Sequence, residues 1–152
     1  MIIQLIIFLL LNFGALALGG LFTGSGVSSD WYNGLNKAPW TPPGWMFGLA
    51  WTTIMICFSV YMAKVWNTGE NKYFLILLFV IQWILNVSWN PVFFYFNLSG
   101  FALIIIVLLA MVVGMILYLN SAQVKWFSLL ILPYFFWLLI ATSLNAYIVF
   151  KN

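Results

Sequence analysis

Five long apolar segments constrain the fold of this chain more than any other feature. A transmembrane helix needs about 20 mostly apolar residues to cross the hydrocarbon core of a bilayer. The sequence supplies five such segments, at about residues 2–22, 45–66, 73–94, 98–119 and 126–150. It lacks the period-two alternation of apolar and polar residues that marks a membrane β-barrel. The sequence therefore predicts an all-α membrane protein, a five-transmembrane-helix bundle in a single domain over residues 1–152.

The composition excludes several classes of function. Charged residues make up 5% of the chain, whereas a soluble domain has about 25%. The chain has no histidine, which removes the usual general base and the usual ligand of metals and haem. Asp30 and Glu70, the two carboxylates, are far apart in the sequence, and there is no arginine for bidentate phosphate recognition. We therefore expect no metal site, no obligatory cofactor and no nucleic-acid partner.

The first connection between the apolar segments differs from the other three. It runs from Thr23 to Gly44 and is rich in Gly, Ser, Trp and Pro. A loop of this length in a compact protein is usually either functional or disordered. Trp31, Tyr32 and Trp40 favour order, because disordered segments are poor in aromatic residues. We predict that this loop is an ordered lid over one end of the bundle, and that the other connections are short breaks at residues 67–71, 97–100 and 120–123.

Nine tryptophans are more than a membrane belt explains. Trp and Tyr gather where the bilayer meets water, and five tryptophans lie at or beyond the ends of the apolar segments, namely Trp31, Trp40, Trp45, Trp66 and Trp126. Trp51, Trp83 and Trp137 lie inside the segments, where no water is available to the indole N–H. An indole at that depth needs a buried partner or a ligand. This pattern predicts an aromatic pocket inside the bundle.

Two of the apolar segments carry side chains with a spacing of four residues, which places them on one helix face. Gln82, Asn86 and Asn90 do so in the third segment, and amides in hydrocarbon need partners. For Gln82 we favour a hydrogen bond between helices; for Asn86 and Asn90 that interpretation and the polar wall of a ligand cavity both stay open. In the fifth segment, Trp137 and Ala141 form either a slot for a ligand or a tight helix contact.

The lysines predict how the bundle is oriented. With five helices, Lys64, Lys72 and Lys125 share the face of the N-terminus, and Lys37 and Lys151 share the opposite face. Cytoplasmic loops carry the excess of Lys and Arg. Three lysines against two favour a cytoplasmic N-terminus in a bacterial plasma membrane.

A set of motifs resembles a known family. The most specific motif is Trp-Thr-Pro-Pro-Gly at residues 40–44, preceded by Trp31-Tyr32 and by Lys37-Ala38-Pro39. Further matches follow in the same order along the chain: Gln82, Leu85-Asn86, Trp89, Pro91, Phe93-Phe94, Pro133-Tyr134, Trp137, Ala141-Thr142 and Leu144-Asn145. In these residues the chain resembles the TspO/MBR family, which includes the tryptophan-rich sensory proteins and the mitochondrial translocator protein, once called the peripheral benzodiazepine receptor.

The resemblance implies a pocket beneath the first loop that accepts porphyrins and, in many members, sterols and benzodiazepine-type drugs. By position it implies a lining of Tyr32, Pro42, Trp51, Asn86, Phe93, Trp137, Ala141 and Leu144. Asn90 joins these candidates from the amide face of the third segment. Family members are commonly dimers, so the resemblance also implies a homodimer.

The resemblance further implies a photochemical role. Bacterial relatives are reported to bind protoporphyrin IX and to promote its light-dependent breakdown with tryptophans equivalent to Trp51 and Trp137, which are therefore the candidate catalytic residues. Because the chain lacks histidine, metal-free protoporphyrin IX is a better guest than haem. We expect a tetrapyrrole-binding sensory or regulatory membrane protein, and whether it is an enzyme stays open. The alternatives are a transporter of porphyrin, sterol or lipid, and a scaffold that regulates a partner membrane protein.

Overall fold

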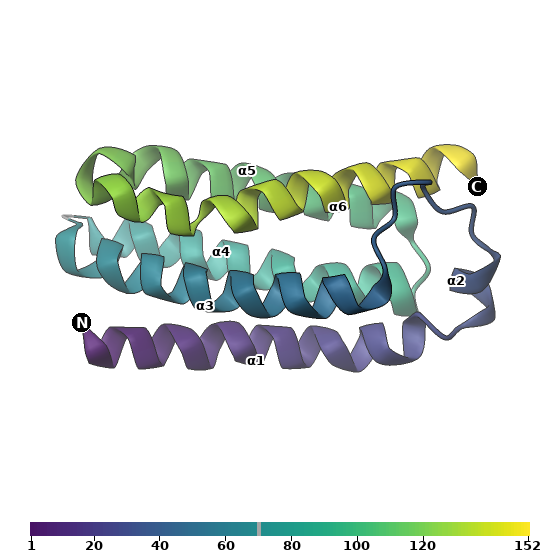
Figure 1. Ribbon diagram of the computed structural model, residues 1–152, viewed down its shortest axis with the longest axis horizontal. Coiled ribbons are helices and arrows are strands. Elements are labelled where there is room, and N and C mark those ends of the chain that lie inside the picture. The colour runs from purple at the N-terminus through teal and green to yellow at the C-terminus, as the bar shows by residue number, and fades with distance from the viewer. Residues whose placement is uncertain (70) are drawn as a thin grey trace.

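Long helices dominate the computed structural model, which describes residues 1–69 and 71–152. Five of them run the length of the molecule (Figure 1): α1 (Ile2–Gly26), α3 (Gly44–Thr68), α4 (Lys72–Asn90), α5 (Ser99–Val124) and α6 (Leu132–Lys151). Alone or with an adjoining turn, each is long and apolar enough to cross a membrane. The prediction of an all-α bundle with five membrane-spanning helices is confirmed.

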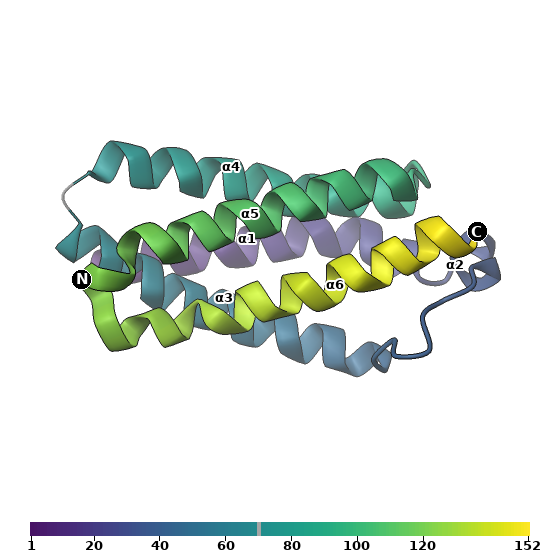
Figure 2. The same ribbon diagram turned by 90° about the horizontal axis from the view of Figure 1, so that it is seen from above.

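The five long helices form a closed ring. Following their contacts, α1 packs against α3, α3 against α6, α6 against α5, α5 against α4, and α4 back against α1. α3 also contacts α5 across the centre. Figure 2 shows α4 on one side of the bundle and α3 and α6 on the other, with α1 and α5 between them. The N-terminus lies at one end of the bundle, and the C-terminus lies with the first loop at the other end (Figure 1).

The buried core lies on the inward faces of α3, α5 and α6. Phe58, Tyr61 and Tyr134 are fully buried there together with Val113 and Leu138. The outward faces are also apolar, and large side chains such as those of Leu10, Ile104 and Met111 are more than half exposed, at 70%, 57% and 64%. Lipid tails are as apolar as leucine, so such faces need no protein cover in a bilayer.

Polar side chains inside the bundle connect α1 to its two neighbours. The Asn12 amide donates a hydrogen bond of 2.8 Å to the hydroxyl of Ser59 on α3. The indole N–H of Trp83 on α4 donates one of 2.9 Å to the backbone carbonyl of Leu11. Each group lies where an unpaired polar atom is costly, so these bonds hold α1 in register against α3 and α4.

Two helix boundaries differ from those expected. Residues 120–123, predicted as a break, belong to α5, since they contain no Gly or Pro to stop a helix. α5 instead ends where Lys125 adopts a positive φ of 48° and a 3₁₀ turn, η2 (Lys125–Leu130), leads into α6. At the opposite end of the bundle, α4 continues into a π-helical turn, η1 (Pro91–Tyr95). Glu70, expected in the break at residues 67–71, lies outside the described residues.

We expect Gly19→Ala to destabilise the protein and Gly20→Ala to leave its stability unchanged or slightly higher. A Cβ at Gly19 would come within 2.5 Å of the Asn90 side-chain nitrogen, and hydrogen bonds to Thr23 and to the Asn86 carbonyl hold that side chain in place, whereas a Cβ at Gly20 would meet nothing within 4 Å. Overpacking typically costs about 1–3 kcal/mol. The thermal midpoints of the two purified variants in detergent measure the difference, and equal midpoints would contradict this close approach of α1 and α4.

Candidate functional site

The first loop is ordered, as predicted, and it covers one end of the bundle (Figure 1). It contains a single short helix, α2 (Asp30–Gly34), whose first turn is capped because the Ser29 hydroxyl accepts a hydrogen bond from the Tyr32 backbone N–H. The rings of Trp31 and Tyr32 pack edge-on against Phe93 in η1, with centroid distances of 5.4 and 6.4 Å. Aromatic contacts therefore hold this half of the loop on the end of α4.

The second half of the loop is fastened to α6. The Trp40 indole N–H donates a hydrogen bond of 3.2 Å to the Ser143 hydroxyl, and its ring lies edge-on to Tyr147 at 5.4 Å. Near the C-terminus, the backbone N–H of Asn36 donates to the side-chain oxygen of Asn152 at 2.8 Å. The loop thus runs from α1 across the end of α4 to α6, and it enters α3 directly afterwards.

Lys37, considered above as a loop lysine, lies against the lid itself. Its ammonium group lies 4.2 Å from the centroid of the Tyr32 ring, a cation–π contact. Burial raises the pKa of the Tyr32 phenol, so this group stays protonated at neutral pH. Lys37 therefore provides a positive charge beside a neutral aromatic surface at the lid end.

Trp89 is a site residue that sequence analysis matched to the family without giving it a role. Its indole N–H donates to the side-chain oxygen of Asn145 on α6, at 3.1 Å, and its ring stacks on Phe93 at 5.0 Å. The Asn145 amide in turn donates to the backbone carbonyl of Ser99 on α5, at 2.9 Å. Asn145 therefore joins α4, α5 and α6 beneath the lid. The signal in the sequence is an indole and an amide that both lie inside apolar segments.

The three amides of α4 have different surroundings. The Gln82 amide donates to the Tyr134 hydroxyl at 2.7 Å, so the interhelical interpretation favoured for it is confirmed. The side-chain oxygen of Asn90 accepts from Thr23 on α1, at 2.7 Å, which turns this amide toward α1. Asn86 is buried, and its side chain forms no hydrogen bond with the described residues. Of the two open cases, Asn90 contacts a neighbouring helix and Asn86 keeps its amide free.

An aromatic seam joins α3 to α6, formed by Phe47, Trp51 and Phe58 on α3 and by Tyr134 and Trp137 on α6. Phe47 meets Trp137 edge-on with centroids 5.4 Å apart, and Trp51 meets Tyr134 in the same way at 5.9 Å. Phe58 contacts Tyr134 at 5.2 Å. The two tryptophans predicted to be catalytic therefore lie in one layer of rings between two helices.

A groove runs beside the aromatic seam on the outside of the bundle. It encloses a cavity of about 330 Å³ that is lined by Met46, Leu49, Ala50, Thr53, Ile54, Pro133, Phe136, Trp137 and Ile140. Leu49 and Phe136 on its edges are more than half exposed. The groove therefore opens sideways, toward the side of the bundle that would face lipid.

Trp137 is the tryptophan that best fits the expectation of a ligand contact. Its side chain is 8% exposed, and its indole nitrogen is buried with no hydrogen-bond partner in the described part of the chain. Trp83, another of the three deep tryptophans, has the carbonyl of Leu11 as its partner. A buried N–H without a partner typically costs about 1–3 kcal/mol, which makes this indole a candidate ligand contact.

The structure distributes the predicted ligand contacts over two regions. Trp51 and Trp137 belong to the aromatic seam, whereas Tyr32 and Phe93 belong to the cluster beneath the lid. The others lie in the lid just before α3 (Pro42), on α4 (Asn86 and Asn90) and on α6 (Ala141 and Leu144). The groove contains Trp137 but none of the other predicted residues, so the binding role of those residues stays a prediction.

Comparison with known proteins gives a consistent result over almost the whole chain. The sequence model described as the TspO/MBR family matches residues 6–151. The tryptophan-rich protein TspO of Chlorobaculum tepidum is 35% identical over 128 residues, covering 82% of this chain and 81% of that protein. The tryptophan-rich sensory protein of Cereibacter sphaeroides is 31% identical, covering 76% and 73%. The human translocator protein is 30% identical, covering 83% and 79%.

We expect Trp89→Phe to lower the free energy of unfolding by about 1–3 kcal/mol, because it leaves the buried oxygen of Asn145 without its donor. Trp45→Phe is the matched control, since Trp45 is 67% exposed. Thermal or denaturant unfolding in detergent provides the measurement. If both substitutions had the same small effect, Asn145 would not be the junction described here.

Proposed function

Because the chain belongs to the TspO/MBR family, we propose that this integral membrane protein binds a tetrapyrrole, metal-free protoporphyrin IX, and acts in sensing or regulation. The observation that carries the proposal is the buried, unpartnered indole N–H of Trp137 at the α3–α6 groove. A free-base porphyrin provides ring nitrogens and a π face that accept such a donor. The relatives named tryptophan-rich sensory protein support a sensory role.

The shape of the groove supports a flat apolar guest. Apart from Thr53, its lining residues are apolar or aromatic, and the Thr53 hydroxyl is already bonded to the backbone carbonyl of Leu49. Its volume of about 330 Å³ is at the lower end of the roughly 300–1,000 Å³ of small-molecule sites. Because the groove opens sideways, one edge of a macrocycle can insert while the rest remains in lipid.

The aromatic seam supports the hypothesis of light-driven chemistry. Trp137 lines the groove, and Trp51 lies in the same α3–α6 aromatic seam, edge-on to Tyr134. On illumination, the excited porphyrin would take one electron from an indole, which leaves a porphyrin radical anion and a tryptophan radical cation. We expect Trp137 to matter for binding and for this transfer, and Trp51 to matter mainly for the transfer.

The proposal includes an orientation and an assembly. The end of the bundle with the N-terminus carries Lys64, Lys72 and Lys125, so by the distribution of positive charge it would face the cytoplasm of a bacterial cell. The lid would then lie on the opposite side of the plasma membrane. A homodimer completes the proposal, and the exposed apolar faces of the helices are compatible with it.

We expect protoporphyrin IX to quench the tryptophan fluorescence of the detergent-solubilised protein saturably in the dark. Trp137→Phe keeps most of the ring but removes the donor, and the loss of about 0.5–1.5 kcal/mol for one hydrogen bond predicts an affinity roughly two- to tenfold lower. Porphyrin absorbance under light then measures degradation, which we expect to slow in both Trp51→Phe and Trp137→Phe.

Trp126→Phe is the matched control, because Trp126 is 82% exposed and belongs to η2. Absence of saturable quenching in the wild-type protein would refute the porphyrin proposal. It would favour the alternative functions, a lipid carrier or a scaffold. Binding with unchanged light-driven loss in both seam variants would refute the photochemical hypothesis and leave a sensor or carrier.

A further inference from the structure

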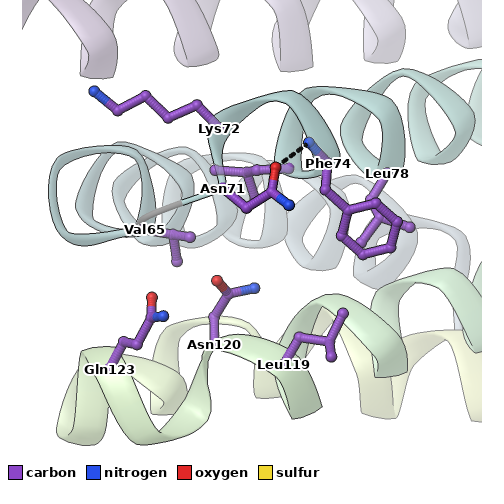
Figure 3. A pocket seen from close by; sticks show the side chains of 10 residues that line it. Val65, Asn71, Lys72, Phe74, Leu78, Leu119, Asn120 and Gln123 are labelled. Carbon is purple, nitrogen blue, oxygen red and sulfur yellow. Dashed lines mark hydrogen bonds between the residues drawn. The ribbon is translucent and has the colours of Figure 1, made fainter.

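A second cavity lies at the end of the bundle opposite the lid, where α4 begins and α3 and α5 end. It encloses about 190 Å³ and is lined by Val65, Gly69, Asn71, Lys72, Phe74, Leu75, Leu78, Leu119, Asn120 and Gln123 (Figure 3). It shares no lining residue with the α3–α6 groove. A ligand here would therefore occupy a separate site, formed by a different set of helices.

The lining changes from polar to apolar with depth in the membrane. On α4, Asn71 and Lys72 lie at the start of the helix, and Leu78 lies about 9 Å deeper, at a rise of about 1.5 Å per residue. On α5, Gln123 lies in the last turn and Asn120 one turn deeper. A phospholipid has the same order along its length: the charged phosphate outermost, the polar glycerol esters below it, and the acyl chains deepest.

The amides of the cavity retain hydrogen-bonding capacity. The side-chain oxygen of Asn71 accepts from the Phe74 backbone N–H at 3.1 Å, and the N–H groups of its amide have no partner among the described residues (Figure 3). The Asn120 amide nitrogen donates to the Ile116 carbonyl at 2.8 Å, which leaves its oxygen as an acceptor. Gln123 is exposed at the mouth. Together these side chains offer donors for phosphate and ester oxygens and acceptors for hydroxyl groups.

One lysine, Lys72, lines the cavity, and two more lie at the same end of the bundle. The Lys72 ammonium lies 5.4 Å from the centroid of the Trp66 ring and points away from Asn120 and Gln123 (Figure 3). The Lys64 ammonium lies 5.0 Å from the centroid of the Phe127 ring at the same end. The chain segments that connect the helices at this end contain or adjoin three lysines, at positions 64, 72 and 125, and one carboxylate, Glu70. This end is therefore basic at the level of the lipid headgroups.

We propose that this cavity binds the headgroup of an anionic phospholipid. Its phosphate lies at the rim beside Lys72, its glycerol esters accept from the second N–H of the Asn120 amide, and an acyl chain runs against Phe74 and Leu119. These last two side chains are 41% and 45% exposed, so the cavity opens to the lipid side. Basic pockets between transmembrane helices are known to take anionic headgroups. A soluble phosphate would leave the deeper, apolar half of the cavity unfilled.

The test is native mass spectrometry of the purified full chain in detergent, titrated with phosphatidylglycerol or with phosphatidylcholine of the same acyl chains. We expect one phosphatidylglycerol to bind more tightly than phosphatidylcholine. We expect Lys72→Gln to weaken that binding about fivefold, the contribution of one lysine near an anionic surface. Gln123→Leu, which removes a lining amide without changing the charge, is also expected to weaken it.

Lys125→Gln is the matched control, because it removes the same charge at the same end of the bundle but lies outside the cavity. We expect its affinity to stay close to that of the wild type. Equal weakening by Lys72→Gln and Lys125→Gln would overturn the proposal in favour of general surface attraction. Displacement of the lipid by equimolar inorganic phosphate or glycerol 3-phosphate would overturn it in favour of a soluble anion.

Two further readouts keep this test independent of folding and of the proposed porphyrin function. A single size-exclusion peak and unchanged helical circular dichroism show that each variant is folded. Lys72 and Gln123 do not line the α3–α6 groove, so quenching by protoporphyrin IX is expected to be unchanged in both variants. Failure of the lipid to bind would therefore overturn the lipid proposal alone. Failure of protoporphyrin IX to bind would overturn the porphyrin proposal alone.

Discussion

The absence of water in the hydrocarbon core is the constraint on which the structure depends. Without water, a polar side chain inside the bundle is costly unless it bonds to another part of the protein. Asn12 therefore bonds to Ser59, and Gln82 bonds to Tyr134. Asn145 has partners on two helices at once. Apolar packing alone specifies neighbours poorly in lipid, because lipid tails compete with it. These directional bonds therefore set which helices lie together and in what register.

Aromatic rings form much of the α3–α6 contact. Phe47 lies edge-on to Trp137, and Trp51 lies edge-on to Tyr134. Aromatic pairs are stabilised in this edge-to-face arrangement. Rings held at such angles do not fill all the space between two helices, and the groove lies beside them. The same arrangement leaves the Trp137 N–H without an acceptor. The groove and the unpartnered Trp137 N–H thus belong to the same α3–α6 contact, where a ligand would add packing and an acceptor.

The sequence predicted the helices well, because each spanning segment is a local property of length and apolarity. It also identified the deep polar groups, since an amide or indole in an apolar run is visible without a structure. It could not assign their partners. Spacing placed Gln82 and Asn90 on one face, but only the packed bundle shows that Gln82 bonds to α6, which is not a ring neighbour of α4, and that Asn90 bonds to α1. For the same reason, sequence analysis could not show that Tyr32 and Phe93 lie in the lid cluster while Trp51 and Trp137 lie in the aromatic seam.

The lid has a consequence for the groove, although it does not line it. It enters α3 directly at Gly44, and its Trp40 is bonded to Ser143 on α6. Asn36 adds a bond to the C-terminal residue of the chain, Asn152. The lid therefore connects the two helices that border the groove and limits their separation at one end, while aromatic contacts limit it further down. A guest that enters from the lipid side would have to widen a gap held at both levels. The fit of the groove to its ligand thus depends on the strength of the lid contacts as well as on the residues that touch the ligand.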